Sequence, residues 1–149
     1  EKFDKYTDTL LYLAARNEHV KYKIKPALIK KKVVICDRFT DSTLAYQVYG
    51  KNVKAEFINN IHKFILDKVK PNITFILKVS IKSARLRLKK RKSLNRYDNF
   101  AQSFYTKAQK SFLKIAKNKK NYFVLDSSKN NSNLEKKIFK IVCNFLKIK

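Results

Sequence analysis

The residues best suited to chemistry follow directly after a short apolar run. Residues 32–37 read K-V-V-I-C-D, and Arg38 comes next. This β-branched run is too short for a helix and predicts a buried strand. Because ligands in open α/β sheets bind beyond the carboxyl ends of the strands, Asp37 and Arg38 would lie at a binding edge. Arg38 offers a planar fork for a phosphate; the alternative is a helix-capping Asp37 beside a solvated Arg38.

The elements around this strand would have to position such a site. Apolar residues recur at the helical period from 6 to 30, where Pro26 predicts a kink or a fresh start. Ser80 is a candidate N-cap for a later helix. The expected helices are 6–30, a short one through 45–47, 55–68, one carrying 85–91, 98–117 and 134–145; the expected strands are 32–37, 73–79 and 122–126. Strands separated by helices predict a parallel α/β fold, and we expect one domain over 1–149.

The composition is that of a packed globular protein with a large positive charge. The formal net charge of +25 would suit a basic nucleic-acid-binding domain, which is the rival interpretation. The lysines are scattered, however, and the aromatic residues fall mostly on apolar stripes, so nucleic acid is disfavoured. Cys36 and Cys143 lack metal-binding spacing, and no apolar run reaches the roughly 18 residues of a membrane span. We therefore expect a cytoplasmic protein with reduced thiols and no membrane contact.

A longer string is far more specific than the Asp-Arg pair with which it begins. Residues 37–47 read DRFTDSTLAYQ, residues 8–16 read DTLLYLAAR, and residues 71–77 read PNITFIL. In this order and spacing the chain resembles the thymidylate kinase family over nearly its whole length. The resemblance implies a P-loop nucleoside monophosphate kinase-like fold, a three-layer α/β/α arrangement with a parallel sheet. It also implies transfer of the γ-phosphoryl group of ATP to dTMP, giving dTDP, with Mg²⁺ and in a homodimer.

The resemblance also assigns a dTMP site. Tyr12 and Arg16 share a helix face at i and i+4, and an aromatic ring beside a donor suits a flat base that bears acceptors. Arg38 matches the arginine on the acceptor phosphate, and Asp37 matches the carboxylate that holds Mg²⁺, directly or through water. Both would be catalytic. The full set expected to bind dTMP is Tyr12, Arg16, Arg38, Ser42, Thr43, Tyr46 and Gln47.

A basic stretch resembles the lid that closes over ATP in the bacterial enzymes. It covers about 85–97 and carries Arg85, Arg87, Lys89, Lys90, Arg91 and Arg96. The resemblance implies ATP contacts from Arg87, Lys89, Arg91 and Arg96. Arg91 and Arg96 would also be catalytic, because lid arginines stabilise the transferring phosphoryl group. A solvated, charged helix is the alternative for any one of these residues.

One motif of the family does not occur in the sequence. There is no G-x-x-x-x-G-K-[ST] phosphate-binding loop, and Gly50 is the single glycine. We therefore expect that the family's P-loop and first two strands precede Glu1, that the fold is truncated here and that the isolated chain is inactive. The gap in the sheet would expose apolar strand residues, namely Val33, Val34, Ile35, Phe75 and Leu77. Another deoxynucleoside or nucleotide kinase of the same fold is the alternative.

Overall fold

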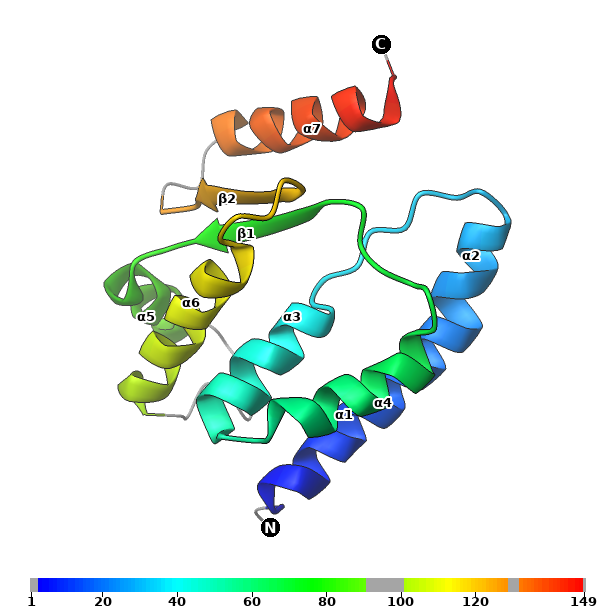
Figure 1. The fold of residues 1–149 in the computed structure, drawn as a ribbon. Coiled ribbons are helices and arrows are strands. Elements are labelled where there is room, and N and C mark those ends of the chain that lie inside the picture. The colour runs from blue at the N-terminus through cyan, green and yellow to red at the C-terminus, as the bar shows by residue number, and fades with distance from the viewer. Residues whose placement is uncertain (1–2, 91–100, 129–131, 149) are drawn as a thin grey trace. The chain divides into compact units, whose positions relative to one another are not determined.

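A computed structural model of the chain describes residues 3–90, 101–128 and 132–148, which form two compact units (Figure 1). The first unit comprises residues 1–72 and 101–117, and the second comprises residues 73–100 and 118–149. The expectation of a single domain over 1–149 stays a prediction. No helix in the described ranges is long and apolar enough to cross a membrane.

The first unit begins with a long, interrupted helix. Asp4 caps α1 (Lys5–His19) by accepting a hydrogen bond from the backbone N of Tyr6 at 2.8 Å. The chain continues through a π-helical segment, η1 (Val20–Ile24), into α2 (Lys25–Ile29), which has its proline in the first turn. A proline cannot donate the hydrogen bond of a helix interior, so the wider π segment and a new first turn accommodate Pro26. The helix predicted over 6–30, with its interruption, is confirmed.

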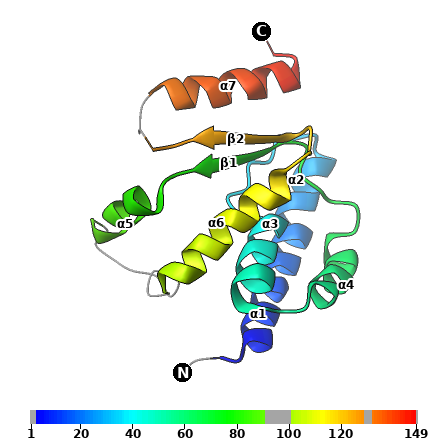
Figure 2. The same ribbon diagram turned by 60° about the vertical axis from the view of Figure 1, so that its left-hand side comes forward.

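A second helical group packs on the first within the same unit. It consists of α3 (Thr40–Thr43), the π-helical η2 (Leu44–Gly50), α4 (Ala55–Leu66) and α6 (Gln102–Ala116). The helix α6 lies along α3 and η2 (Figure 2). The α1–α4 contact includes the Tyr6 and Phe57 rings, whose centroids are 5.3 Å apart, edge to face. Fully buried Ala45 and Ile58 lie in this core.

Gly50 makes the close approach of η2 to α6 possible. A Cβ added at Gly50 would lie 2.5 Å from Cε2 of the buried Phe104. We expect Gly50→Ala to lower the free energy of unfolding by about 1–3 kcal/mol in urea denaturation, because the ring would have to move. Since Ala is normally the better helix residue, a loss of stability would come from this overlap. The double variant Gly50→Ala/Phe104→Leu should recover part of the loss; no recovery would contradict the explanation.

The second unit contains a two-stranded parallel sheet. Strand β1 (Thr74–Lys78) pairs with β2 (Tyr122–Asp126), with Thr74 opposite Tyr122. The helix α5 (Ile81–Lys89) follows β1 and α7 (Ser132–Leu146) follows β2. Ser80 caps α5 by accepting a hydrogen bond from the backbone N of Ser83 at 3.1 Å. The two predicted strands, their parallel pairing and the Ser80 cap are confirmed.

The strand predicted over 32–37 is wrong. This segment has no regular secondary structure, and the sheet of the described residues consists of β1 and β2. A β-branched run becomes a strand only where a neighbouring strand satisfies its backbone groups, and 32–37 has no such partner among the described strands. Its apolar side chains stay in solvent: Val33 is 63% and Ile35 is 95% exposed. The expected exposure is confirmed for Val33, Ile35 and Leu77, whereas Val34 and Phe75 are half-buried.

Candidate functional site

Two residues from separate parts of the predicted dTMP set meet in the first unit. Arg16 on α1 donates a hydrogen bond from Nη2 to Oγ1 of Thr43 on α3 at 3.0 Å. The guanidinium carbon of Arg16 also lies 4.9 Å from the ring centroid of Phe39. The Nε atom of Arg16 is buried and has no hydrogen-bond partner among the described residues. The Arg16 side chain is therefore held in place and retains an unused donor.

Burial sets the electrostatics around Arg16. Desolvation lowers the pKa of Arg16, and the neighbouring Cys36 and Asp41 oppose that shift. The guanidinium nevertheless remains charged at any physiological pH. Burial also raises the pKa of the Cys36 thiol, which Arg16 partly offsets. A charged group that has lost water gains more from an added acceptor than a solvated one does. The local environment therefore favours a ligand with acceptor oxygens.

Arg38 and Tyr46 form the second contact between predicted site residues. The guanidinium carbon of Arg38 lies 5.1 Å from the centroid of the Tyr46 ring. Two aromatic residues of α6 hold that ring: the centroids of Phe104 and Phe112 are 5.8 Å and 5.9 Å from it. The side chain of Tyr46 is thus fixed by α6, while Arg38 itself is exposed.

The backbone of Arg38 adopts a left-handed conformation, with φ at 63°. Other non-glycine residues with positive φ in the described chain lie within two positions after a helix end, where this conformation is common: Lys31, Asn52, Asp67, Asn118 and Lys147. Arg38 instead precedes α3. Strained backbone conformations are enriched at functional sites, where the surrounding structure holds a residue in an unfavourable conformation. The backbone of Arg38 is therefore consistent with a functional role for its side chain.

The remaining residues of the predicted dTMP set lie on the same elements. Tyr12 stands one turn before Arg16 on α1 and is partly exposed. Ser42 on α3 is half-buried and Gln47 on η2 is buried. The backbone carbonyl of Gln47 accepts a hydrogen bond from the N atom of Val53 at 3.0 Å. The structure thus carries the predicted set on α1 and on the continuous stretch from Arg38 to η2.

His62 on α4 is a residue that the sequence analysis missed. It is 8% exposed, and its Nε2 atom is buried with no hydrogen-bond partner in the part of the chain that the structure describes. Burial, and secondly the charge of Arg16, lower the pKa of His62 to about 4. The sequence around a single histidine on an amphipathic helix does not reveal that its side chain is buried or that its pKa is lowered. Phe104 and Phe112 were not predicted to lie at the site, and Phe39 stands in the string over 37–47 but was given no role of its own.

The predicted lid residues lie in the second unit or outside the described residues. Arg87 on α5 donates hydrogen bonds from Nη2 to the carbonyl oxygens of Ser127 at 2.6 Å and Ser128 at 3.3 Å. Lys89 is exposed in the last turn of α5. Arg91 and Arg96 fall outside the described residues. The role of these residues toward ATP stays a prediction.

Asp37 carries the carboxylate that was expected to hold Mg²⁺. The side chain is exposed, and the described residues contain no group of three or more His, Cys, Asp or Glu that could hold a metal ion by itself. Mg²⁺ often takes one or two protein carboxylates and completes its shell with water and substrate phosphates. A single accessible carboxylate next to Arg38 fits that mode of binding.

Parallel strands that are each followed by a helix place the second unit in the α/β class. The structure is similar to the crystal structure of thymidylate kinase from Ehrlichia chaffeensis, with a TM-score of 0.73 and 29% identity. That match covers 95% of this chain and 68% of the other chain. The predicted P-loop kinase fold class is thereby confirmed.

The family follows from the sequence comparisons. The family model described as thymidylate kinase matches residues 1–138. The thymidylate kinase of Onion yellows phytoplasma (strain OY-M) is 40% identical over 133 residues, which are 87% of this chain and 64% of the relative. That of Wolbachia sp. subsp. Brugia malayi (strain TRS) is 43% identical over 79% of this chain and 56% of its own length. The chain belongs to the thymidylate kinase family, and it spans under two thirds of these two relatives.

Proposed function

We propose that this chain forms the dTMP-binding part of a kinase that transfers the γ-phosphoryl group of ATP to dTMP, giving dTDP. Family membership supports this reaction class. The observation that carries the proposal is that two arginines of the predicted set each contact another residue of that set within the first unit. Arg16 is bonded to Thr43 at 3.0 Å, and Arg38 lies 5.1 Å from the ring of Tyr46.

The proposed roles divide between the base, the sugar and the phosphate. Tyr12 offers a partly exposed ring for stacking on thymine. Arg16, one turn further along α1, is the proposed donor to a thymine carbonyl. Tyr46 stands beside the deoxyribose, and Arg38 binds the phosphate through its guanidinium fork. Ser42, Thr43 and Gln47 complete the lining of the base and sugar.

The proposed phosphoryl transfer requires that the two substrates are positioned and that their negative charge is neutralised. The acceptor is a phosphate monoester with a second pKa near 6, so it is already anionic at neutral pH and needs no general base. Arg38 holds it in line for attack. Asp37 would hold Mg²⁺, which neutralises charge on the ATP phosphates when bound. Arg87, Lys89, Arg91 and Arg96 would contribute cations to ATP from the lid.

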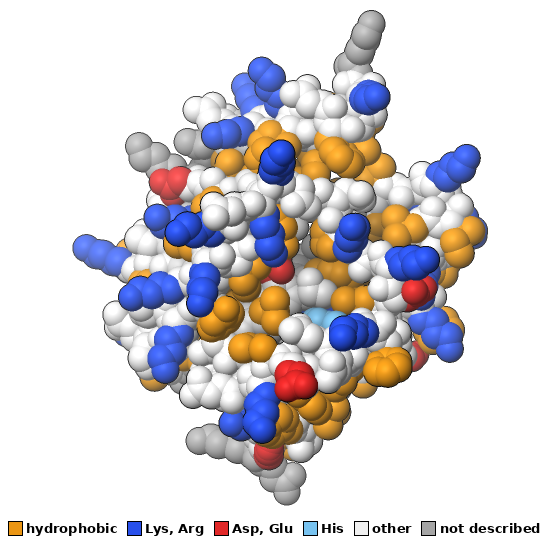
Figure 3. All heavy atoms as spheres, viewed as in Figure 1, with side chains coloured by type: hydrophobic (Ala, Val, Ile, Leu, Met, Phe, Trp, Pro, Cys, Tyr) orange, Lys and Arg blue, Asp and Glu red, His pale blue; other side chains and the backbone are white. Residues whose placement is uncertain are grey.

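A second copy of the chain is the proposed partner. Large apolar side chains remain exposed on the helices of the first unit, including Leu11 on α1, Ile29 on α2 and Phe64 on α4. Apolar side chains also lie at the surface among lysines and arginines in Figure 3. Contiguous exposed apolar surface is typical of protein interfaces. Sedimentation analysis tests the homodimer.

A cytoplasmic location is also proposed for this kinase.

Arg16→Ala is expected to weaken dTMP binding to the chain by about 1.5–3 kcal/mol, because one charged hydrogen bond is lost. Isothermal calorimetry with dTMP measures the change. Lys21→Ala is the matched control, since it removes one positive charge from an exposed residue of η1. Equal affinities of wild type and Arg16→Ala would rule out the assigned base site.

A further inference from the structure

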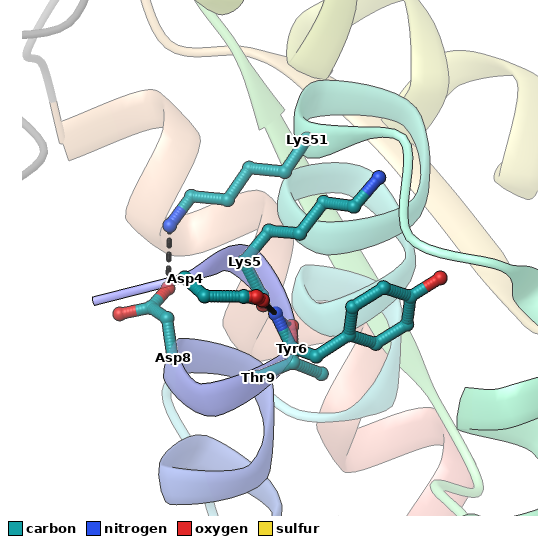
Figure 4. Close-up of polar contacts among 6 residues, drawn as sticks. All are labelled: Asp4, Lys5, Tyr6, Asp8, Thr9 and Lys51. Atoms are coloured by element: carbon teal, nitrogen blue, oxygen red, sulfur yellow. Dashed lines mark hydrogen bonds and ion pairs between the residues drawn. The ribbon is translucent and has the colours of Figure 1, made fainter. Parts of the chain in front are cut away.

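A buried ion pair joins the two helices that carry the proposed base site. Nζ of Lys51, directly after η2, contacts Oδ2 of Asp8 on α1 (Figure 4). The side chains of Lys51 and Asp8 are 14% and 2% exposed. The Lys25–Asp67 pair, which joins α2 to the end of α4 at 3.2 Å, is far more exposed at 37% and 62%. The two pairs therefore differ sharply in how much water surrounds them.

The turn that carries Lys51 is also tied down on both sides. Gly50 packs directly against the Phe104 ring of α6, where no side chain would fit. Lys5 in the first turn of α1 donates from Nζ to the carbonyl oxygen of Asn52 at 3.0 Å. The turn closes when the N atom of the buried Val53 donates to the carbonyl oxygen of Gln47. The start of α1 and the turn after η2 are thus joined by two lysine contacts, Lys5 to Asn52 and Lys51 to Asp8.

The segments α3 and η2 are consecutive and form one continuous helical stretch opposite α1. At the other end of this stretch, Thr43 accepts the hydrogen bond from Arg16 of α1. About two helical turns separate Asp8 from Arg16 on one helix, and a similar stretch separates Thr43 from Lys51 on the other. Tyr12 lies between the two connections on α1, and Tyr46 lies between them on η2. The Asp8–Lys51 pair therefore connects the two segments at the end opposite to the Arg16–Thr43 hydrogen bond.

We propose that the Asp8–Lys51 ion pair positions Arg16 and Tyr12 relative to Tyr46 and so sets the affinity of the site for the thymine base. This inference rests on the proposed function. A buried ion pair adds little net stability compared with apolar residues of the same size, so the role proposed here is to specify how α1 and η2 are arranged. Asp8 and Lys51 are positioning residues, because they act on the ligand through Arg16 and Tyr12.

The experiment measures binding of dTMP and of uncharged thymidine to wild type, Asp8→Asn, Lys51→Met and Lys25→Met. Asp8→Asn makes the protein more positive and Lys51→Met makes it less positive, so long-range attraction of dTMP would change in opposite directions. Positioning instead predicts that both variants weaken both ligands by about tenfold or more. Lys25→Met, which carries the same charge change as Lys51→Met, should stay within about twofold of wild type. Lys51→Arg keeps the pair and should retain binding.

A second readout needs no ligand. The Nε–H group of Arg16 is buried, so its NMR signal should be protected from exchange and sensitive to its surroundings. This signal should shift in Asp8→Asn and Lys51→Met and stay in place in Lys25→Met. Each variant is compared only when it unfolds cooperatively, and the isosteric Asp8→Asn decides the matter if Lys51→Met does not fold.

The outcomes separate the two proposals. If wild type binds neither dTMP nor thymidine, the proposed function fails, and the Arg16 signal still decides whether the ion pair positions that residue. If wild type binds while Asp8→Asn binds as well or better, the positioning role is overturned. A loss confined to dTMP, with thymidine unaffected, also overturns it, because the pair would then act through charge rather than through the base site.

Discussion

Replacing Arg38 by Asn is expected to weaken dTMP binding by at least about tenfold while leaving the free energy of unfolding unchanged or raised. The proposed site uses the Arg38 fork on the phosphate, and hydrogen bonds to charged groups are the strong ones. At the same time Arg38 has a φ of 63° although it does not follow the C-terminal end of a helix. Asn adopts this conformation more readily than Arg, so the substitution relieves strain as it removes the ligand contact.

Calorimetry with dTMP and thymidine separates the phosphate contact from any effect on the base. Thymidine should bind Arg38→Asn as it binds wild type. Lys31→Asn is a matched control, because Lys31 is exposed, has φ at 54° and loses the same charge. It should keep the affinity for dTMP. An equal loss of both ligands in Arg38→Asn would mean that Arg38 acts by packing on Tyr46 rather than by binding phosphate.

Acidification is expected to remove about 3 kcal/mol of stability through His62. Burial, and secondly Arg16, lower its pKa in the folded protein from 6.5 to about 4. Between these two values the unfolded chain binds a proton at His62 and the folded chain does not. The stabilisation is therefore fully present above pH 6.5 and is lost as the pH falls toward 4.

Urea denaturation at a series of pH values tests this contribution. Carboxylates titrate in the same range, so the informative quantity is the difference between wild type and His62→Gln. That difference should shrink as the pH falls, because Gln carries no proton-dependent penalty. His19→Gln, which removes the exposed histidine of α1, is the matched control. Parallel curves for wild type and His62→Gln would show that His62 is not the group responsible.

Most local elements could be predicted from the sequence, and so could a set of candidate residues for the proposed site. The 3.6-residue period located α1, α4 and α7, Pro26 located the interruption after η1, and Ser80 located the start of α5. The strands β1 and β2 were predicted because each is a short β-branched or aromatic run bounded by breakers. The string over 37–47 pointed to Arg38, Thr43 and Tyr46 through its resemblance to the thymidylate kinase family.

Features that depend on a residue far away in the chain could not be predicted from local sequence patterns. The apolar run 32–37 has the composition of a strand, but strand formation requires a neighbour in register, which no local pattern encodes. The same holds for Phe104, whose position on an apolar stripe does not reveal that it packs on Tyr46 and Gly50. His62 acquires its low pKa, and Lys51 its carboxylate partner, because folding removes both from water beside residues far away in the chain.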